Sequence, residues 1–189
     1  VTDMTDAFKE KATFNADISG WDVSNVTDMT QMFMKAWAFD QDLSSWDVSS
    51  VESMEKMFKG GQIGTENNLN SFNGNITGWD VSNVTNFWAM FNETGSFNQD
   101  ISSWNVSSAT TMKQMFRKAA AFNQDIGGWN VSSVTSMHQM FTLATAFNKD
   151  LSSWDVSEVN TMLAMFQGAD GVTTAFNQDI SAWDVSGVI

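Results

Sequence analysis

The chain has 189 residues, with 22 acidic and 9 basic side chains and a formal net charge of −13. That charge excludes nucleic acid and anionic membranes as partners, because phosphate groups and acidic lipids repel such a surface. The absence of Cys excludes disulfides and thiolate metal sites. No apolar run approaches the ~20 residues that a membrane-spanning helix needs, so we expect no membrane insertion.

A tryptophan recurs along the chain at nearly constant spacing. It stands at Trp21, Trp46, Trp79, Trp104, Trp129, Trp154 and Trp183. The intervals are 25, 33, 25, 25, 25 and 29 residues, a period typical of repeat proteins in which each unit packs on its neighbours. We expect one elongated domain over residues 1–189. An N-terminal half-repeat covers 1–13, and repeats start near 14, 39, 72, 97, 122, 147 and 176.

Each unit predicts a short strand followed by a short helix. In the first unit, residues 21–23 alternate apolar and polar side chains, as a strand does. Apolar residues then recur on what reads as one face of a helix. They are Val26, Met29, Met32, Phe33 and Ala36. We therefore expect an α/β fold: a right-handed leucine-rich-repeat solenoid of about seven ~25-residue strand–helix units. A short parallel sheet would form one face and short helices the other, with the repeated Trp, Met and Phe in the core.

Two units are longer than the others, through insertions at 60–71 and 168–174. Both insertions fall in the same turn of the repeat, so we expect them to leave the same edge of the domain. Insertions in repeat proteins often lie on a binding face. The alternative is that both are neutral decorations.

Equivalent positions of a repeat array align as columns, and two of these columns are acidic. One comprises Asp17, Asp42, Asn75, Asp100, Asp125, Asp150 and Asp179. The other comprises Asp22, Asp47, Asp80, Asn105, Asn130, Asp155 and Asp184. Such carboxylates either accept hydrogen bonds from backbone N–H groups of their own turns or bind a divalent cation. Calcium takes roughly six to eight oxygen ligands, so the Asp residues of both columns are candidate calcium ligands. A third column, from Asn15 to Asn177, predicts a hydrogen-bonded ladder.

Two further tryptophans break the repeat pattern. Trp88 takes a polar position of the expected helix, and Trp37 takes a small-residue position. We expect both to be exposed, and an exposed Trp is a favoured interface anchor. Trp37 and Trp88 are therefore candidate ligand-binding residues, with local packing as the alternative reading. Eight of the nine basic residues fall on or just after the expected helices, which predicts an acidic strand face and a mixed helical face.

The repeat follows the pattern F-N-x-D-I/L-S-x-W-D/N-V-S-x-V-T-x-M-x-x-M-F-x-x-A, as residues 97–107, 147–157 and 176–186 illustrate for its first half. This pattern resembles the BspA-like leucine-rich repeats of bacterial surface proteins, also called the mycoplasma lipoprotein repeat, over essentially the whole chain. The resemblance implies an extracellular protein, at the cell surface or secreted. It also implies a binding protein, typically an adhesin, and it brings no catalytic residues. Because the chain begins inside an expected helical half-repeat and ends just after an expected strand, we expect it to be part of a larger surface protein.

We therefore expect a ligand-binding module of a bacterial surface adhesin and not an enzyme, because a surface repeated seven times offers no single desolvated pocket. Its partner would be a protein or glycan on a cell surface, or a second copy of the chain. In such a homodimer calcium would bridge the acidic faces, since two surfaces of charge −13 repel each other without cations between them. The alternative is a structural spacer with no ligand of its own.

Overall fold

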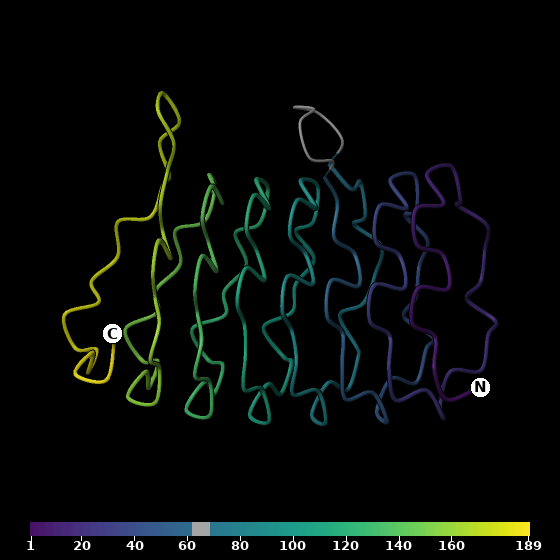
Figure 1. The fold of residues 1–189 in the computed structure, drawn as a ribbon, viewed down its shortest axis with the longest axis horizontal. Coiled ribbons are helices and arrows are strands. Elements are labelled where there is room, and N and C mark those ends of the chain that lie inside the picture. Colours follow the sequence, from purple (N-terminus) through teal and green to yellow (C-terminus); the bar gives the residue numbers. More distant parts are fainter. Residues whose placement is uncertain (62–68) are drawn as a thin grey trace.

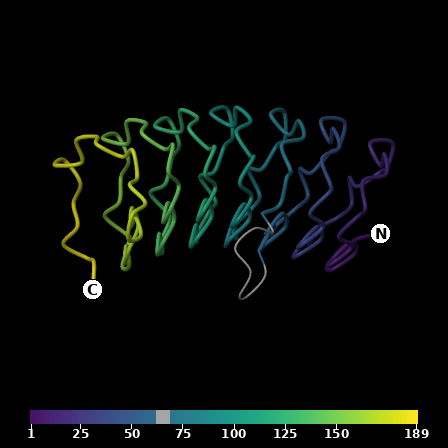
Figure 2. The ribbon, with the colours of Figure 1, turned by 90° about the horizontal axis from the view of Figure 1, so that it is seen from above.

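The computed structural model describes residues 1–61 and 69–189, and within them the chain forms a row of coils stacked side by side. The two termini lie toward opposite ends of the row (Figures 1 and 2). These residues contain no helix, and their β-structure is limited to isolated bridges. Parallel bridges join one position of each coil to the next, and an antiparallel bridge joins Ala169 to Val172. The positions in the parallel bridges are Asp3, Asp28, Ser53, Asn86, Thr111, Ser136 and Thr161.

The predicted α/β leucine-rich-repeat solenoid of strand–helix units is therefore wrong. Residues 29–36, expected to be a helix, form successive turns. Gln31 and Lys35 have φ of 56° and 59°, in the left-handed region that a right-handed helix excludes. Ten further non-glycine residues at 6, 10, 56, 89, 93, 114, 118, 139, 143 and 164 share this conformation. The spacing of apolar residues misled the prediction, because the turns also direct residues 29, 32, 33 and 36 inward.

We call residues 3–11, 28–36, 53–61, 86–94, 111–119, 136–144 and 161–168 the Met halves of the coils. In a Met half, alternate backbone N–H groups donate to carbonyls of the next coil. From the first full coil to the second, the pairs are Met29 to Ser53, Gln31 to Glu55, Phe33 to Met57 and Lys35 to Lys59, at 2.7–3.0 Å. Intervening N–H groups close turns within the coil, as Met32 does onto the Met29 carbonyl at 3.2 Å. The backbone itself thus joins neighbouring Met halves.

We call residues 14–26, 39–51, 72–84, 97–109, 122–134, 147–159 and 176–188 the Trp halves. Here side chains make most of the bonds between coils. The indole Nε1 of Trp46 donates to the Ile18 carbonyl of the preceding coil at 3.1 Å. Trp79, Trp104, Trp129, Trp154 and Trp183 donate in the same way. The strand predicted at residues 21–23 is absent, because the chain turns at 19–20 and again at 24–25, where Val26 N–H donates to the Val23 carbonyl at 2.8 Å.

The predicted Asn ladder is confirmed. The side-chain oxygen of Asn73 accepts the backbone N–H of Asn98 at 2.9 Å, and Asn98 accepts that of Asn123 in turn. The same bond runs from Asn15 to Asn177 through every coil, with Asp40 in the second. A short polar side chain therefore performs the coil-to-coil bonding that a backbone ladder performs in the Met halves.

The core lies between the two halves of each coil, and the assignment of the repeated Trp, Met and Phe to it is confirmed. Phe rings of adjacent coils stack, as Phe33 does on Phe58 with centroids 5.5 Å apart. Trp21 is 43% exposed because no coil with a Trp half precedes it, whereas Trp46 is only 3% exposed. No helix in the described part of the chain is long and apolar enough to cross a membrane.

Candidate functional site

The acidic column that begins at Asp22 lies on the surface and caps tight turns. Asp22 Oδ1 accepts the backbone N–H of Ser24 at 3.1 Å and its hydroxyl at 2.7 Å. Equivalent turns form at Asp47, Asp80, Asn105, Asn130, Asp155 and Asp184. Hydrogen bonds from Ser24 lower the pKa of Asp22, and those from Ser49 lower the pKa of Asp47 although the Asp22 charge opposes the shift.

The column that begins at Asp17 uses its carboxylates in the same way. Asp17 Oδ1 accepts the Ser19 N–H at 2.9 Å, and hydrogen bonding lowers the pKa of this carboxyl. Equivalent bonds form at Asp42, Asn75, Asp100, Asp125, Asp150 and Asp179. Within residues 1–61 and 69–189, no three acidic or His side chains gather as a metal-binding group. The structure shows that these columns cap turns, whereas calcium binding by them stays a prediction.

The two candidate binding tryptophans are half-buried and not exposed as expected. The Trp88 ring packs between the Met halves of its neighbours, with Lys56 Nζ 3.7 Å and Lys113 Nζ 4.9 Å from its centroid. The carbonyl of Trp37 accepts a hydrogen bond from Ser71 at 3.3 Å. The indole nitrogens of Trp37 and Trp88 are buried and have no partner among the described residues. Trp88 therefore forms a cation–π cluster, and a ligand-binding role for Trp37 and Trp88 stays a prediction.

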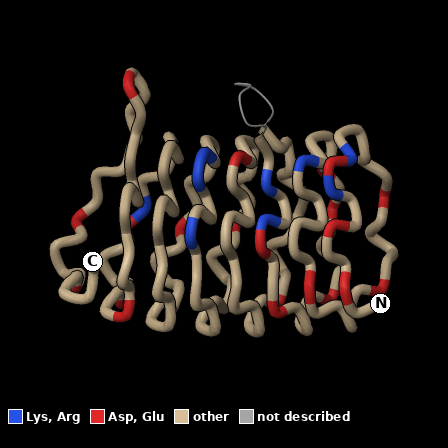
Figure 3. Tube along the Cα trace, viewed as in Figure 1, with Lys and Arg blue, Asp and Glu red and all other residues tan. Residues whose placement is uncertain are grey.

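The Met halves carry a cleft of about 560 Å³ on their outward side, which we call the Met face. Its lining comes from five successive coils. The lining residues are Met34, Lys35, Lys59, Gly61, Asn92, Glu93, Gln114, Arg117, Lys118 and Gln139. Figure 3 shows Lys and Arg in the upper part of the coils, while Asp and Glu also follow their lower edge. The cleft therefore gathers positive charge on a strongly acidic chain.

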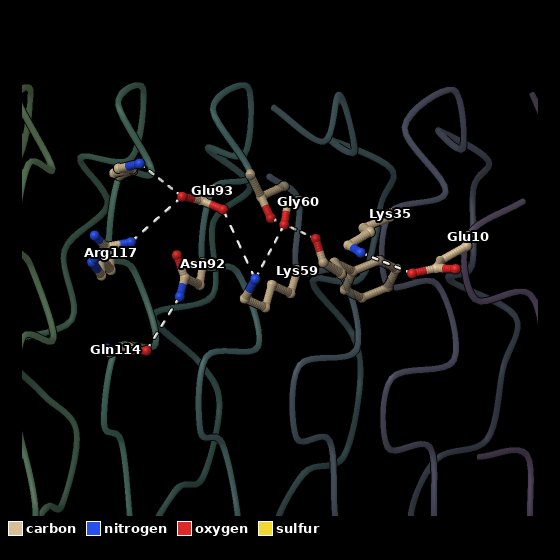
Figure 4. A network of polar contacts seen from close by, with 11 residues as sticks. Glu10, Lys35, Lys59, Gly60, Asn92, Glu93, Gln114 and Arg117 are labelled. Atoms are coloured by element: carbon tan, nitrogen blue, oxygen red, sulfur yellow. Dashed lines mark hydrogen bonds and ion pairs between the residues drawn. The ribbon is translucent and has the colours of Figure 1, made fainter. Parts of the chain in front are cut away.

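Glu93 stands at the centre of the cleft, between three cations (Figure 4). Its Oε1 is 2.7 Å from Lys118 Nζ and 3.5 Å from Arg117 Nη1, and its Oε2 is 3.9 Å from Lys59 Nζ. The Glu93 side chain is 14% exposed. At the near end, Lys35 pairs with Glu10 of the preceding coil at 2.8 Å. The Glu93 pairs join three successive Met halves, and the Lys35–Glu10 pair joins the two Met halves before them.

Two polar groups in the cleft are incompletely paired. Asn92, 2% exposed, donates from Nδ2 to Gln114 Oε1 at 3.4 Å, while its Oδ1 is buried without a partner in the described ranges. Arg117 Nε is likewise buried and unpaired there. Burial lowers the pKa of Lys59, with smaller contributions from Lys35, Lys56 and Arg117 against the opposing charge of Glu93. The cleft thus has one buried acceptor and one buried donor that lack partners among the described residues, together with an excess of cations.

Sequence reasoning missed this cleft, although a signal for it is present. Glu10 and Lys35 occupy one column in adjacent coils, and so do Glu93 and Lys118, 25 residues apart in each case. Opposite charges one period apart predict ion pairs between coils. The convergence of Lys59 and Arg117 on Glu93 could not be read in this way, because the unit that separates Lys59 from Glu93 contains the first insertion.

The first insertion borders the cleft, and its residues 62–68 lie outside the described residues. The backbone N–H of Gly60 donates to the Asn92 carbonyl, and that of Asn70 donates to the Glu93 carbonyl at 2.9 Å. A Cβ on Gly60 would collide with the Glu93 oxygen, so glycine allows this close approach. The second insertion rises at the upper edge of the row (Figure 1). Whether both leave the same edge stays a prediction.

The chain matches one known family over its whole length. Residues 1–68, 64–174 and 144–189 match DUF285, described as "Mycoplasma protein of unknown function". Comparison with curated proteins and with solved structures gave no match. The three matched stretches overlap and together cover the whole row of coils. By this match, the chain belongs to the DUF285 family.

Proposed function

We propose that this chain is a binding module of a bacterial surface adhesin that recognises a protein or glycan through the cleft on the Met face. The sequence resemblance to BspA-like repeats supports a place at the cell surface. The observation that carries the proposal is the cleft of about 560 Å³, in which Asn92 Oδ1 and Arg117 Nε are buried without partners in residues 1–61 and 69–189. Its size is that of a small-ligand pocket.

The Met face supports specific recognition better than the acidic columns do. Every coil repeats the same capped turn in the Trp half, so one column offers similar surroundings along the row. Glu93 and its three cations occur together once in the described chain. A ligand that meets a unique arrangement of charges is discriminated from others, whereas a uniform ladder offers no preferred register. The spacer alternative needs no such arrangement.

The direct test is a binding screen with the purified chain immobilised on a sensor. Extracellular-matrix proteins, acidic glycans and neutral glycans are passed over it in millimolar calcium and again in chelator. We expect at least one of them to bind the wild type and to bind a Lys59→Gln/Arg117→Gln double variant at least ~10-fold more weakly, as loss of two charge-assisted contacts implies.

The matched control is Lys9→Gln/Lys149→Gln, which changes net charge equally outside the cleft and should bind like the wild type. If a partner binds the immobilised chain in calcium but not in chelator, the result would support the predicted calcium bridging. A chain that retains no partner under either condition would contradict the proposal and favour the spacer.

A further inference from the structure

The charge of the cleft is opposite in sign to that of the chain. Four cations line it (Lys35, Lys59, Arg117 and Lys118) against Glu93, and Glu10 pairs with Lys35 at its near end, so 4 − 2 gives a local excess of two positive charges. At physiological ionic strength, exposed charges more than about 8 Å away are largely screened. A small anion inside the cleft therefore meets mainly these cations, while a long polyanion also meets the acidic remainder of the chain.

Glu93 does not satisfy these cations fully. Lys118 is in direct contact with it at 2.7 Å, but Arg117 and Lys59 are 3.5 and 3.9 Å away. A strong charge-assisted hydrogen bond between nitrogen and oxygen is ~2.8 Å long. Arg117 and Lys59 therefore keep donor capacity for an incoming anion, and the buried Nε of Arg117 has no partner among the described residues.

The amide side chains of the cleft define a second requirement. Gln114 donates from Nε2 to Gln139 Oε1 at 2.6 Å. The Oε1 of Gln114 therefore faces Asn92 as an acceptor, and Asn92 turns its Nδ2 toward that oxygen. This orientation leaves Asn92 Oδ1 as a buried acceptor without a donor among the described residues. A ligand that complements the cleft has to bring a hydrogen-bond donor next to its anionic group.

We propose that the cleft binds a sugar acid, with the carboxylate on Arg117 and Lys59 and a ring hydroxyl donating to Asn92 Oδ1. This inference rests on the proposed function and names its ligand class. A carboxylate matches the planar guanidinium of Arg117, and a vicinal hydroxyl supplies the donor. Sulfate supplies no donor, and a neutral sugar leaves the cations unmatched. Amide side chains in the lining suit hydroxyl groups better than the apolar side chains of a peptide.

The first experiment titrates the chain with sodium D-glucuronate, sodium acetate, glucose and N-acetylglycine while side-chain amide NMR signals are recorded. We expect saturable shifts with glucuronate at Asn92 and Gln114, binding at least ~10-fold weaker for acetate, and no saturation with glucose, because only glucuronate satisfies both the cations and Asn92. Equal binding of acetate, or of N-acetylglycine, overturns the assignment to a sugar acid, as does the absence of saturable shifts with glucuronate.

Charge variants give a second, sign-specific test. Arg117→Gln should weaken glucuronate binding by ~10-fold or more, the effect expected for one lost charge-assisted hydrogen bond. Glu93→Gln removes the carboxylate that competes with glucuronate for the cations and should tighten glucuronate binding. Lys149→Gln, in a Trp half, makes the same charge change as Arg117→Gln and should leave it unchanged. Thermal unfolding shows which variants fold. If Arg117→Gln does not fold, the affinity of Glu93→Gln for glucuronate still tests the proposal.

The two proposals fail in distinguishable ways. If the screen finds a ligand whose binding is insensitive to Arg117→Gln, the adhesive function stands and the cleft is not its site. If Glu93→Gln weakens glucuronate binding, the carboxylate of glucuronate does not lie among the cations around Glu93, and the assignment of the cleft to a sugar acid is overturned. If the screen finds a ligand but glucuronate does not bind, only the present inference falls.

Discussion

The Trp half and the Met half of each coil are bonded to their neighbours by different groups. In the Trp half, indole, Asn and Ser side chains reach the backbone of the adjacent coil, as Trp104 reaches the Ile76 carbonyl. In the Met half the backbone makes these bonds itself, as between Gln31 and Glu55. The side chains of the Trp halves are therefore needed for the bonds between coils. The outward side chains of the Met halves are not, so they can differ from coil to coil.

This difference explains where a specific site arises. One outward column of the Met halves contains Thr30, Glu55, Trp88, Lys113 and His138 in successive coils. The Asp22 column of the Trp halves contains only Asp and Asn. Because the Met half backbone tolerates this variety, charges from several coils converge on Glu93 without loss of the bonds between coils. The repeated side chains of the Trp halves hold the coils together, and the varied outward side chains of the Met halves form the specific site.

The comparison predicts its largest effect at a Trp of the stack. Trp104 is 3% exposed and its indole is bonded to Ile76. Trp104→Ala should lower the free energy of unfolding by ~3–5 kcal/mol, as truncation of a buried aromatic does. Trp104→Phe keeps an aromatic ring but loses the hydrogen bond to the Ile76 carbonyl, which still accepts the Trp79 N–H, so the loss should be about 0.5–1.5 kcal/mol. Chemical denaturation measures both values.

Trp21→Ala is the matched control, because Trp21 is 43% exposed and lies at the end of the row. Its effect should be clearly smaller than that of Trp104→Ala. Equal losses for the two variants would contradict the view that bonding across coils, and not the residue type, gives Trp104 its importance.

A smaller effect tests the turn conformation of the Met half. Gln31 has φ of 56°, where glycine avoids the steric cost that a Cβ imposes. Gln31→Gly should therefore raise the free energy of unfolding by about 0.5–1 kcal/mol, whereas in a helix the same change costs about 1 kcal/mol. Gln31→Ala keeps the Cβ and should bring no such gain. If Gln31→Gly instead destabilised the chain, the result would contradict the left-handed turn and favour the helix predicted at this position.

The smallest effect concerns the carboxylates of the Trp half. Asp47 accepts the Ser49 N–H at 3.0 Å, and Asn130 accepts the Ser132 N–H at 3.1 Å. Asp47→Asn should thus leave the melting temperature near that of the wild type at neutral pH, while Asp47→Ala should lower it. Circular dichroism measures these temperatures, and a loss with Asp47→Asn equal to that with Asp47→Ala would show that charge, not hydrogen-bond acceptance, matters.

The pH dependence of this effect has a definite sign. The pKa of Asp47 is lowered in the folded chain from its ordinary value of 3.8. Its contribution to stability is therefore present above pH 3.8 and is lost as the pH falls through the folded pKa. Asp47→Asn cannot titrate, so its melting temperature should fall less steeply on acidification than that of the wild type.

Much of the stack could be predicted from residue types in register, but its local conformation could not. Apolar residues at 29, 32, 33 and 36 are compatible with a helix or with linked turns, since both bury the same face. Gln31 and Lys35 adopt the left-handed conformation although neither is glycine, so their residue types gave no indication of the turns. For the site, one-period charge pairs such as Glu93 and Lys118 were readable, but the exposure expected for Trp88 was wrong because neighbouring lysines pack on its ring.

The sequence by itself determined the repeat, the identity of the core residues and the Asn ladder, because each depends on the same residue type recurring at one position of every coil. Only the tertiary structure decided that the coils are turns without helices, and that Lys59, Glu93 and Arg117 meet in one cleft. The reason is physical. Hydrogen bonds between coils select the left-handed turns, and the path of the chain between Lys59 and Glu93 sets which charges converge.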